Sequence, residues 1–370
     1  MSTTAPTAWQ AAAMRLAGDL RATGALRSDQ VAEAIRSVPR HRFLPDAGSA
    51  DTPSASLLER SYADRGIMTH TPEDAAGTYS STSQPSIVAK MLEAAGLRRG
   101  MRVLEIGAGT GWHAALIAHI TRTQVTTVEH SAVVAAEARS ALERVSTPDV
   151  TVITGDGYDG DPVGAPYDLI VATCGISGVP PDWLRQLADR GTVLAPVAHG
   201  GMHPLMRIRV TSDGPRGRLV TAADFMTAEG ALYAAAELSP ATAGTPLPAP
   251  NPANVQPGAV PNLDPHGAYL DLWMHLAARD QRITCGAAAD GRLAGCTLVD
   301  GQHAVYIQPD ALHPTPGPGG QALADHAVRL IRDWTECGRP PLTAWSCSLT
   351  PAGRAQRPVL APAHWELRRR

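Results

Sequence analysis

The chain has 370 residues, of which 44% are hydrophobic and 18% are charged, and its net charge at pH 7 is −3. This length exceeds the usual size of one hydrophobic core, so we expect two domains. The charge does not favour binding to nucleic acid, and no stretch approaches the ~20 uninterrupted apolar residues of a membrane span. The first residues do not have the pattern of a signal peptide, and the five cysteines are scattered without a C-x-x-C pair. The sequence therefore predicts a cytoplasmic protein with reduced thiols, bound neither to nucleic acid nor to a membrane and without a metal site.

Three amphipathic helices are predicted before the sheet. The first covers Thr7 to Leu26, and the second starts after Ser28 as its cap and is ended by Pro39. The stretch from Ser49 to Ser81 is polar and weakly patterned, and connections of this length are usually functional or disordered. A third amphipathic helix, Ile87 to Ala95, leads into the first strand of the sheet. The sequence thus favours a helical cap in front of the sheet.

A short apolar strand, a glycine turn and a helix follow one another between Val103 and Ile120. This order predicts a ligand-binding crevice at the carboxyl end of a parallel sheet. Trp112 stands where a dinucleotide-binding loop needs its last glycine, and the Gly-Lys-Ser/Thr ending of a phosphate loop is missing. The pattern E-x-G-x-G-x-G, from Glu105 to Gly111, resembles instead the cofactor loop of S-adenosylmethionine-dependent methyltransferases. A glycine turn in another doubly wound fold is the alternative at this point.

Strands and helices continue to alternate after this loop. Strands are predicted at Gln124–Val128, Val150–Ile153, Tyr167–Thr173 and Gly191–Val197, with a helix at Val134–Val145. Leu205–Val210 and Leu219–Phe225, joined by turn residues Asp213 to Pro215, are predicted to close the sheet as an antiparallel hairpin. The alternation indicates an α/β fold with a mostly parallel sheet.

The last third of the chain has a different pattern. Ser239 to Gly267 is rich in proline and is predicted to be an extended linker. Beyond it, helices are predicted at Ala268–Arg279 and Gln321–Cys337, and strands at Arg282–Cys285, Leu293–Leu298, Ala304–Gln308 and Leu342–Leu349. We therefore expect a cap with a substrate loop over residues 1–80, a sheet domain over 81–238, the linker over 239–267 and a smaller α+β domain over 268–370.

Two acidic residues stand at strand ends where a nucleoside could bind. Glu129 ends the second strand about 20 residues after Gly107, a spacing from which a carboxylate can accept hydrogen bonds from ribose hydroxyls. Asp156 follows the third strand inside a Gly-Asp-Gly turn, where it could bind the amino group of adenine. The alternatives are a solvated glutamate at a strand end and an aspartate that only forms its turn.

Several motifs together resemble the protein-L-isoaspartate O-methyltransferase family. In the order of that family they are VPRHRFLP (Val38–Pro45), the pair Tyr62 and Asp64, TSQPSIVAKML (Thr82–Leu92), VLEIGAGTGW, GDG and PYDLIVAT, and they cover about residues 30 to 226. The resemblance implies a class I, Rossmann-like methyltransferase fold. It also implies that S-adenosyl-L-methionine is the cofactor and S-adenosyl-L-homocysteine a product, with the methyl group passing to a carboxylate. Such a carboxylate is already ionised at pH 7, so no strong general base is required.

The resemblance also assigns roles to individual residues. Ser83 matches the serine that hydrogen-bonds the substrate next to the methyl group, although it could simply cap the following helix. Thr82 and Gln84 would shape the same catalytic wall. The cofactor would be bound by Glu105, Gly107, Ala108, Gly109, Gly111, Glu129, His130, Asp156, Gly157 and Thr173. The substrate would meet Tyr62, Asp64, His113 and Cys174.

The sequence departs from the repair enzymes of this family in the stretch Gly66–Ser81 and in the extension after the sheet. With such an extension, the chain is similar to the branch found beside ribosomal-peptide maturation systems with ATP-grasp ligases. That branch methylates an aspartyl side chain of a cyclised precursor peptide, whose ester collapses to an aspartimide. We therefore predict this function and a peptide partner. General repair of isoaspartyl proteins is the alternative, and a non-catalytic peptide carrier is the hypothesis from another class.

Overall fold

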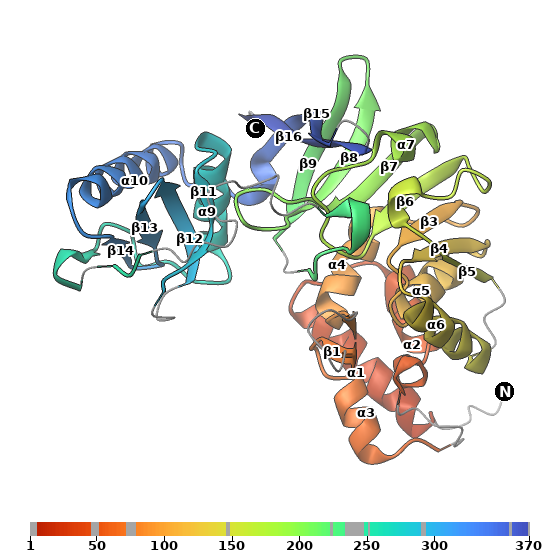
Figure 1. The fold of residues 1–370 in the computed structure, drawn as a ribbon. Helices are drawn as coiled ribbons and strands as arrows, with labels where there is room; N and C mark the ends of the chain where they lie inside the picture. The colour runs from red at the N-terminus through yellow and green to blue at the C-terminus, as the bar shows by residue number, and fades with distance from the viewer. Residues whose placement is uncertain are drawn as a thin grey trace. The chain divides into compact units, whose positions relative to one another are not determined.

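The computed structural model describes residues 6–45, 52–71, 79–145, 149–222, 225–233, 248–250, 252–289, 294–354 and 357–368. The chain forms two compact units (Figure 1). The first comprises Met1–Cys174 and Asp182–Leu194, and the second comprises Gly175–Pro181 and Ala195–Arg370. Each unit contains its own buried core.

The first unit starts with the helical cap that the sequence predicts. Its elements are α1 (Ala8–Ala22), α2 (Asp29–Ser37), the 3-10 turn η1 (Arg40–Phe43), α3 (Ala55–Ser61) and the hairpin strands β1 (Ile67–His70) and β2 (Ser80–Thr82). The Ser28 hydroxyl accepts a hydrogen bond from the Val31 amide at 3.4 Å, which confirms the predicted cap of α2. The Glu93 carboxylate on α4 (Pro85–Ala95) accepts hydrogen bonds from the amides of Arg27 and Ser28 at 2.9 and 2.7 Å. These bonds fix the cap to the helix that leads into the sheet.

The sheet of the first unit is parallel and has the predicted α/β topology. Its strands lie in the order β7 (Leu187–Pro196), β6 (Tyr167–Ala172), β3 (Val103–Ile106), β4 (Val125–Glu129) and β5 (Val150–Thr154). The helices α5 (Trp112–Thr121) and α6 (Ala132–Arg144), the 3-10 turn η3 (Gly157–Asp159) and α7 (Pro181–Arg185) connect them. The chain runs from β3 outward to β5 and then returns to the other side of β3 as β6. This switch in strand order opens a crevice at the carboxyl end of β3, where the glycine loop stands.

The second unit contains two sets of antiparallel strands, of which the first belongs to a nine-stranded sheet and the second forms a five-stranded sheet. One has the order β16 (Arg357–Leu367), β15 (Trp345–Arg354), β9 (Gly214–Thr221) and β8 (Leu205–Thr211). The other has the order β10 (Gln256–Pro257), β14 (Ala311–Pro314), β13 (His303–Ile307), β12 (Ala294–Asp300) and β11 (Ile283–Ala287). Side chains of α9 (Ala268–Arg279) and α10 (Pro318–Glu336) pack with the second sheet in one hydrophobic core. The short 3-10 turns are η4 (Gly230–Leu232), η5 (Pro252–Asn254) and η6 (Leu342–Ala344).

Three features of the second unit differ from the sequence prediction. Strand β9 starts at Gly214, earlier than the predicted Leu219, because Gly214 itself ends a tight turn with φ 98°. Of the predicted linker, residues 239–247 and 251 lie outside the described residues. Its later part is not a linker, since β10 pairs with β14, and Val260 and Leu263 are buried in the core. The strand predicted at the end of the tail is β15, and it pairs with β9.

None of the helices that the structure describes is long and apolar enough to cross a membrane. In the same described ranges, no group of three or more His, Cys, Asp or Glu side chains is arranged to hold a metal ion.

Candidate functional site

The glycine loop after β3 depends on its glycines for conformation and for space. Gly107, Gly109 and Gly111 have φ values of 94°, 50° and 83°, a region that residues with a side chain rarely adopt. A Cβ on Gly107 would lie 2.7 Å from the Thr173 hydroxyl oxygen, and one on Gly109 would lie 3.4 Å from the Ser81 carbonyl oxygen. The loop is therefore packed against the end of β6 on one side and against β2 on the other.

Thr173 and Cys174 follow β6 and face this loop. The Thr173 hydroxyl donates to the Gly107 carbonyl at 2.6 Å, so it holds the first turn of the loop in place. Burial, together with the carboxylates of Glu129 and Glu105, raises the pKa of Cys174 to about 12. The thiol is therefore protonated at neutral pH, which suits a wall of the pocket and not a nucleophile.

Glu105 on β3 is completely buried and bonded to its neighbours. Its carboxylate lies 2.6 Å from Nδ1 of His113 and accepts from the Thr127 hydroxyl at 2.5 Å. These contacts tie β3 to β4 and to the first turn of α5. Among the described residues, Nε2 of His113 is buried without a hydrogen-bond partner. A buried imidazole nitrogen of this kind offers a hydrogen bond to a bound ligand.

Glu129 ends β4 beside the glycine loop, as predicted. Its carboxylate accepts from the amides of Gly109 and Ser131, both at 3.1 Å, and is therefore held in one position. The following residue, His130, is exposed. Asp156 accepts from the Tyr158 amide at 2.9 Å and so also forms its own turn, while the Gly157 carbonyl accepts from the Trp183 indole at 3.0 Å. Both carboxylates stand at the sheet edge where a nucleoside is expected, and their roles toward it stay predictions.

The serine motif runs along β2 and into α4. Thr82 is buried, Ser83 is half-buried and Gln84 is exposed. The Asp64 carboxylate accepts from the Ser86 amide at 2.8 Å and from the Gln84 side chain at 3.2 Å. Asp64 thus binds the amino end of α4, a position where a negative charge is stabilising. This is a structural role that the sequence prediction of a substrate contact did not include.

Tyr62, the partner of Asp64 in the motif, is buried inside the cap. Its hydroxyl lies 3.0 Å from Nδ1 of His41, and burial raises the pKa of Tyr62 above its ordinary value. Burial also lowers the pKa of His41 to about 4, so the imidazole is neutral at pH 7. The hydrogen bond between the Tyr62 hydroxyl and His41 stabilises the cap. A contact between Tyr62 and the substrate stays a prediction.

Arg40 is the site residue that the sequence analysis missed. Its side chain is completely buried, and its guanidinium donates to the carbonyls of Ser61, Ala63, Arg65 and Ser83, at 2.6, 3.2, 3.1 and 3.0 Å. The guanidinium carbon also lies 5.1 Å from the centre of the Trp112 ring, at the start of α5. Burial lowers the pKa of Arg40 to about 10, which still leaves it charged at neutral pH. Arg40 is the first arginine of the motif VPRHRFLP and follows Pro39 directly. Its place in this motif was the one sign of its importance in the sequence.

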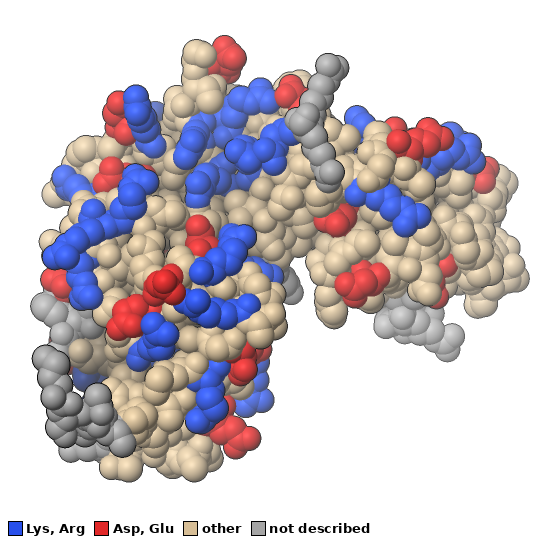
Figure 2. Space-filling view, turned by 180° about the vertical axis from the view of Figure 1, so that it is seen from behind, with Lys and Arg blue, Asp and Glu red and all other residues tan. Residues whose placement is uncertain are grey.

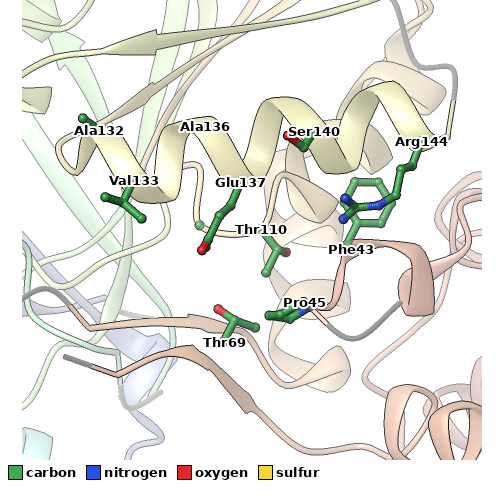
Figure 3. A pocket seen from close by; sticks show the side chains of 11 residues that line it. Phe43, Pro45, Thr69, Thr110, Ala132, Val133, Ala136, Glu137, Ser140 and Arg144 are labelled. Atoms are coloured by element: carbon green, nitrogen blue, oxygen red, sulfur yellow. The ribbon is translucent and has the colours of Figure 1, made fainter. Parts of the chain in front are cut away.

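A cavity of about 590 Å³ adjoins the glycine loop. It is lined by Gly109 and Thr110, by α6, and by residues of the cap and β1 that include Pro45 and Thr69. In Figure 3, Val133 and Glu137 on α6 face Pro45 and Thr69 across this space. The volume is typical of a small-ligand pocket, about 300 to 1,000 Å³. Of the predicted cofactor contacts, Gly109 lines this cavity, whereas Glu129 and Asp156 do not.

Comparisons with known proteins show what the chain is similar to in sequence and in fold. The family model for "Protein-L-isoaspartate(D-aspartate) O-methyltransferase (PCMT)" matches residues 11–228. A protein-L-isoaspartate O-methyltransferase of Methanopyrus kandleri is 37% identical over 203 residues, which are 54% of this chain and 83% of the relative. One of Thermotoga maritima is 38% identical over 172 residues, 46% of this chain and 51% of the relative. A solved structure described as a protein-L-isoaspartate O-methyltransferase covers 95% of this chain and 100% of its own, with a TM-score of 0.55 and 24% identity.

Proposed function

The chain belongs to the protein-L-isoaspartate O-methyltransferase family, and from that premise we propose that it esterifies the side-chain carboxylate of isoaspartyl residues in polypeptides. It is an S-adenosylmethionine-dependent methyltransferase with the class I α/β fold, and the family acts on protein or peptide substrates. The predicted fold, enzyme class and cofactor are thereby confirmed. The observation that carries the proposal is the contact between the glycine loop and β2, the strand that ends next to Ser83.

The residues around the glycine loop fit the cofactor. A Cβ at Gly107 would collide with the Thr173 hydroxyl, so only glycine fits at this position. Without a side chain there, a ligand can approach the backbone of the loop. The fixed Glu129 carboxylate suits ribose hydroxyls, and the unpartnered buried Nε2 of His113 suits a further polar group. When bound, S-adenosylmethionine supplies an electrophilic methyl group on its sulfonium. Glu129 and Asp156 would hold the adenosine part of the cofactor, and the backbone of Gly107 and Gly109 would leave room for its methionine part.

The protein's part in the reaction is to position the acceptor and to exclude water. Ser83 would donate a hydrogen bond to one oxygen of the substrate carboxylate, and its own backbone is fixed by Arg40. The other oxygen would be left free to accept the methyl group of the bound cofactor, with an O–C bond formed, the S–C bond broken and the electron pair of that bond left on sulfur. Because the acceptor is already an anion, no general base has to remove a proton from it. The rate enhancement then comes from the orientation of the acceptor within the site. The cavity beside Gly109 is large enough for a side chain that flanks the acceptor.

Two functions on peptides are candidates: general methylation of isoaspartyl residues and methylation of one dedicated precursor peptide. They differ in the range of substrates that the enzyme accepts. The extension after the sheet was the main reason for predicting a dedicated precursor peptide, but the solved structure that covers 95% of this chain has a similar fold, with a TM-score of 0.55. The extension therefore does not favour the dedicated function, and general isoaspartyl methylation is better supported. Within this extension, Trp273 and Trp345 are buried and so belong to the protein interior, not to a surface for a precursor peptide. Methylation of an aspartate in a cyclised precursor is the narrower candidate.

A substrate panel tests this proposal. We expect the purified chain to add one methyl group, seen by mass spectrometry, to an unstructured isoaspartyl peptide, and the ester then to lose methanol as a succinimide forms. The same peptide with an ordinary aspartate is the matched control and should not react. Reaction of aspartate in a cyclised peptide, with no reaction of the isoaspartyl peptide, would establish the narrower candidate instead. Truncation at Ser239 is a poor test, because it would remove β15 from its pairing with β9.

Glu129→Gln is expected to weaken cofactor binding by about tenfold to hundredfold, since hydrogen bonds to a charged acceptor contribute about 1.5–3 kcal/mol. Isothermal titration with S-adenosylhomocysteine measures the effect. Glu143→Gln, which removes the same charge from an exposed position on α6, serves as the control and should leave the affinity unchanged. Equal affinities of the two variants would contradict the assignment of Glu129 to the ribose.

A further inference from the structure

The hairpin of β8 and β9 carries four arginines on one face. Arg207 lies opposite Arg218, and Arg209 lies opposite Arg216, in the antiparallel register of the two strands. Because side chains alternate along a strand, these four point to the same side, while the residues between them, such as Ile208, are buried on the other side. We call these four residues the arginine array. Figure 2 shows Lys and Arg side chains gathered on the surface of this hairpin, below its tip.

In the arginine array, each arginine of one strand faces an arginine of the other strand, so positive charges lie directly opposite each other. Such cross-strand pairs destabilise an antiparallel ribbon, whereas opposite charges in the same places would stabilise it. Partial burial, together with Arg209 and Arg218, lowers the pKa of Arg207 below its ordinary value. An anion bound over the array would relieve this repulsion.

The neighbouring strands show which kind of anion fits. On β15, Ser346 lies opposite Arg218 and Ser348 lies opposite Arg216, so the charge of the array is not neutralised from that strand. Arg216 donates to the Glu366 carboxylate on β16 at 2.7 Å. Of the four arginines, Arg216 alone has an acidic partner among the residues that the structure describes. A carboxylate therefore already binds at one corner of the array, and three guanidinium groups stay available for others.

The dimensions match an extended acidic peptide. Opposite residues in the array are about 5 Å apart, and residues two apart on one strand are about 7 Å apart. Carboxylates at alternate positions of an extended peptide have the same spacing, about 7 Å, and arginine can bind each one through two parallel hydrogen bonds. A nucleic-acid-binding domain usually has a strongly basic overall charge, whereas this chain has a net charge of −3. The small array on an acidic chain favours a peptide.

We propose that the arginine array docks an acidic segment of the polypeptide substrate, with carboxylates at alternate positions. This inference rests on the proposed function, because it takes the substrate to be a polypeptide. It adds a preference for sequence context outside the residues that surround the acceptor.

The test uses the full chain and the double variant R209E/R218E. Each new glutamate faces an arginine on the other strand, so the variant should melt at the same temperature as the parent or higher. An unchanged melting temperature would show that a loss of peptide binding is not caused by misfolding. The matched control is R15E/R332E, which makes the same change of charge at two exposed helix positions. The probe is a fluorescent peptide of alternating glutamate and serine, with its glutamine–serine counterpart as the neutral control. We expect fluorescence anisotropy to show binding that weakens with salt, and that falls at least about tenfold in R209E/R218E but not in R15E/R332E.

Methyl transfer provides an independent measurement. For an isoaspartyl peptide with acidic flanking residues, KM should rise in R209E/R218E, while a neutral isoaspartyl peptide should keep its kcat and KM. Equal binding of the acidic probe by the variant and the parent, or tighter binding of single-stranded DNA than of the probe, would overturn the proposal. If the parent binds the acidic probe but methylates no peptide, the array is supported and the proposed function fails.

Discussion

Replacing Arg40 with alanine is expected to lower the free energy of unfolding by about 4 kcal/mol, because four carbonyl oxygens, that of Ser61 in a buried contact and the other three in partly buried ones, lose a charged donor. The carbonyls of Ser61, Ala63 and Arg65 belong to the segment that enters β1, and that of Ser83 lies between β2 and α4. Without the guanidinium these two segments repel each other through their unsatisfied oxygens. Since Ser83 is held through its carbonyl, kcat should fall as well.

Chemical unfolding followed by tryptophan fluorescence and circular dichroism measures the loss of stability. Arg42→Ala is the matched control, because Arg42 lies on the same 3-10 turn but is only half-buried, and it should cost less than about 1 kcal/mol. Arg40→Lys should recover part of the stability, since an ammonium group has three donors for the four carbonyls. An Arg40→Ala protein as stable as the Arg42→Ala control would show that water satisfies these carbonyls and that Arg40 does not organise the site.

The sequence predicted the parts of the site that a local pattern encodes. The apolar strand, the glycines and the amphipathic helix between β3 and α5 are each a short-range signal, and Glu129 follows from the alternation of strands and helices. Arg40 could not be found in this way, because its partners are backbone carbonyls far away in the chain, which no pattern of side chains records. The capping of α4 by Asp64 was missed for the same reason. Ser83 was found only through its resemblance to a family motif.

The fold of the tail shows a similar limit. Helices α9 and α10 were predicted from their apolar periodicity, but β10 is a pair of residues in a proline-rich segment and has no period. Strand β16 contains Pro358 and Pro362, which normally count against a strand. Its place at the end of the strand order explains why they are tolerated, since an edge strand leaves some amides without a ladder partner. Strand β15 pairs with β9, and the paired residues are more than a hundred positions apart in the chain. A local sequence pattern does not record such a contact.

Ser83→Ala is expected to reduce kcat for an isoaspartyl peptide by about a hundredfold, because the acceptor carboxylate loses the hydrogen bond that keeps its other oxygen in line with the methyl group. The affinity for S-adenosylhomocysteine and the melting temperature should not change, because the contact that fixes this residue is made by its carbonyl. Ser83→Thr keeps the hydroxyl and should recover part of the activity.

Ser86→Ala is the matched control, because Ser86 lies in the same motif but contacts Asp64 through its amide. Steady-state kinetics on both variants, with methyl esters quantified by mass spectrometry, separate kcat from KM. A large rise in KM with kcat unchanged would make Ser83 a residue that only binds substrate. A Ser83→Ala enzyme with the kcat of the Ser86→Ala control would contradict the role of this hydroxyl, and the acceptor would then have to be oriented by the walls of the crevice alone.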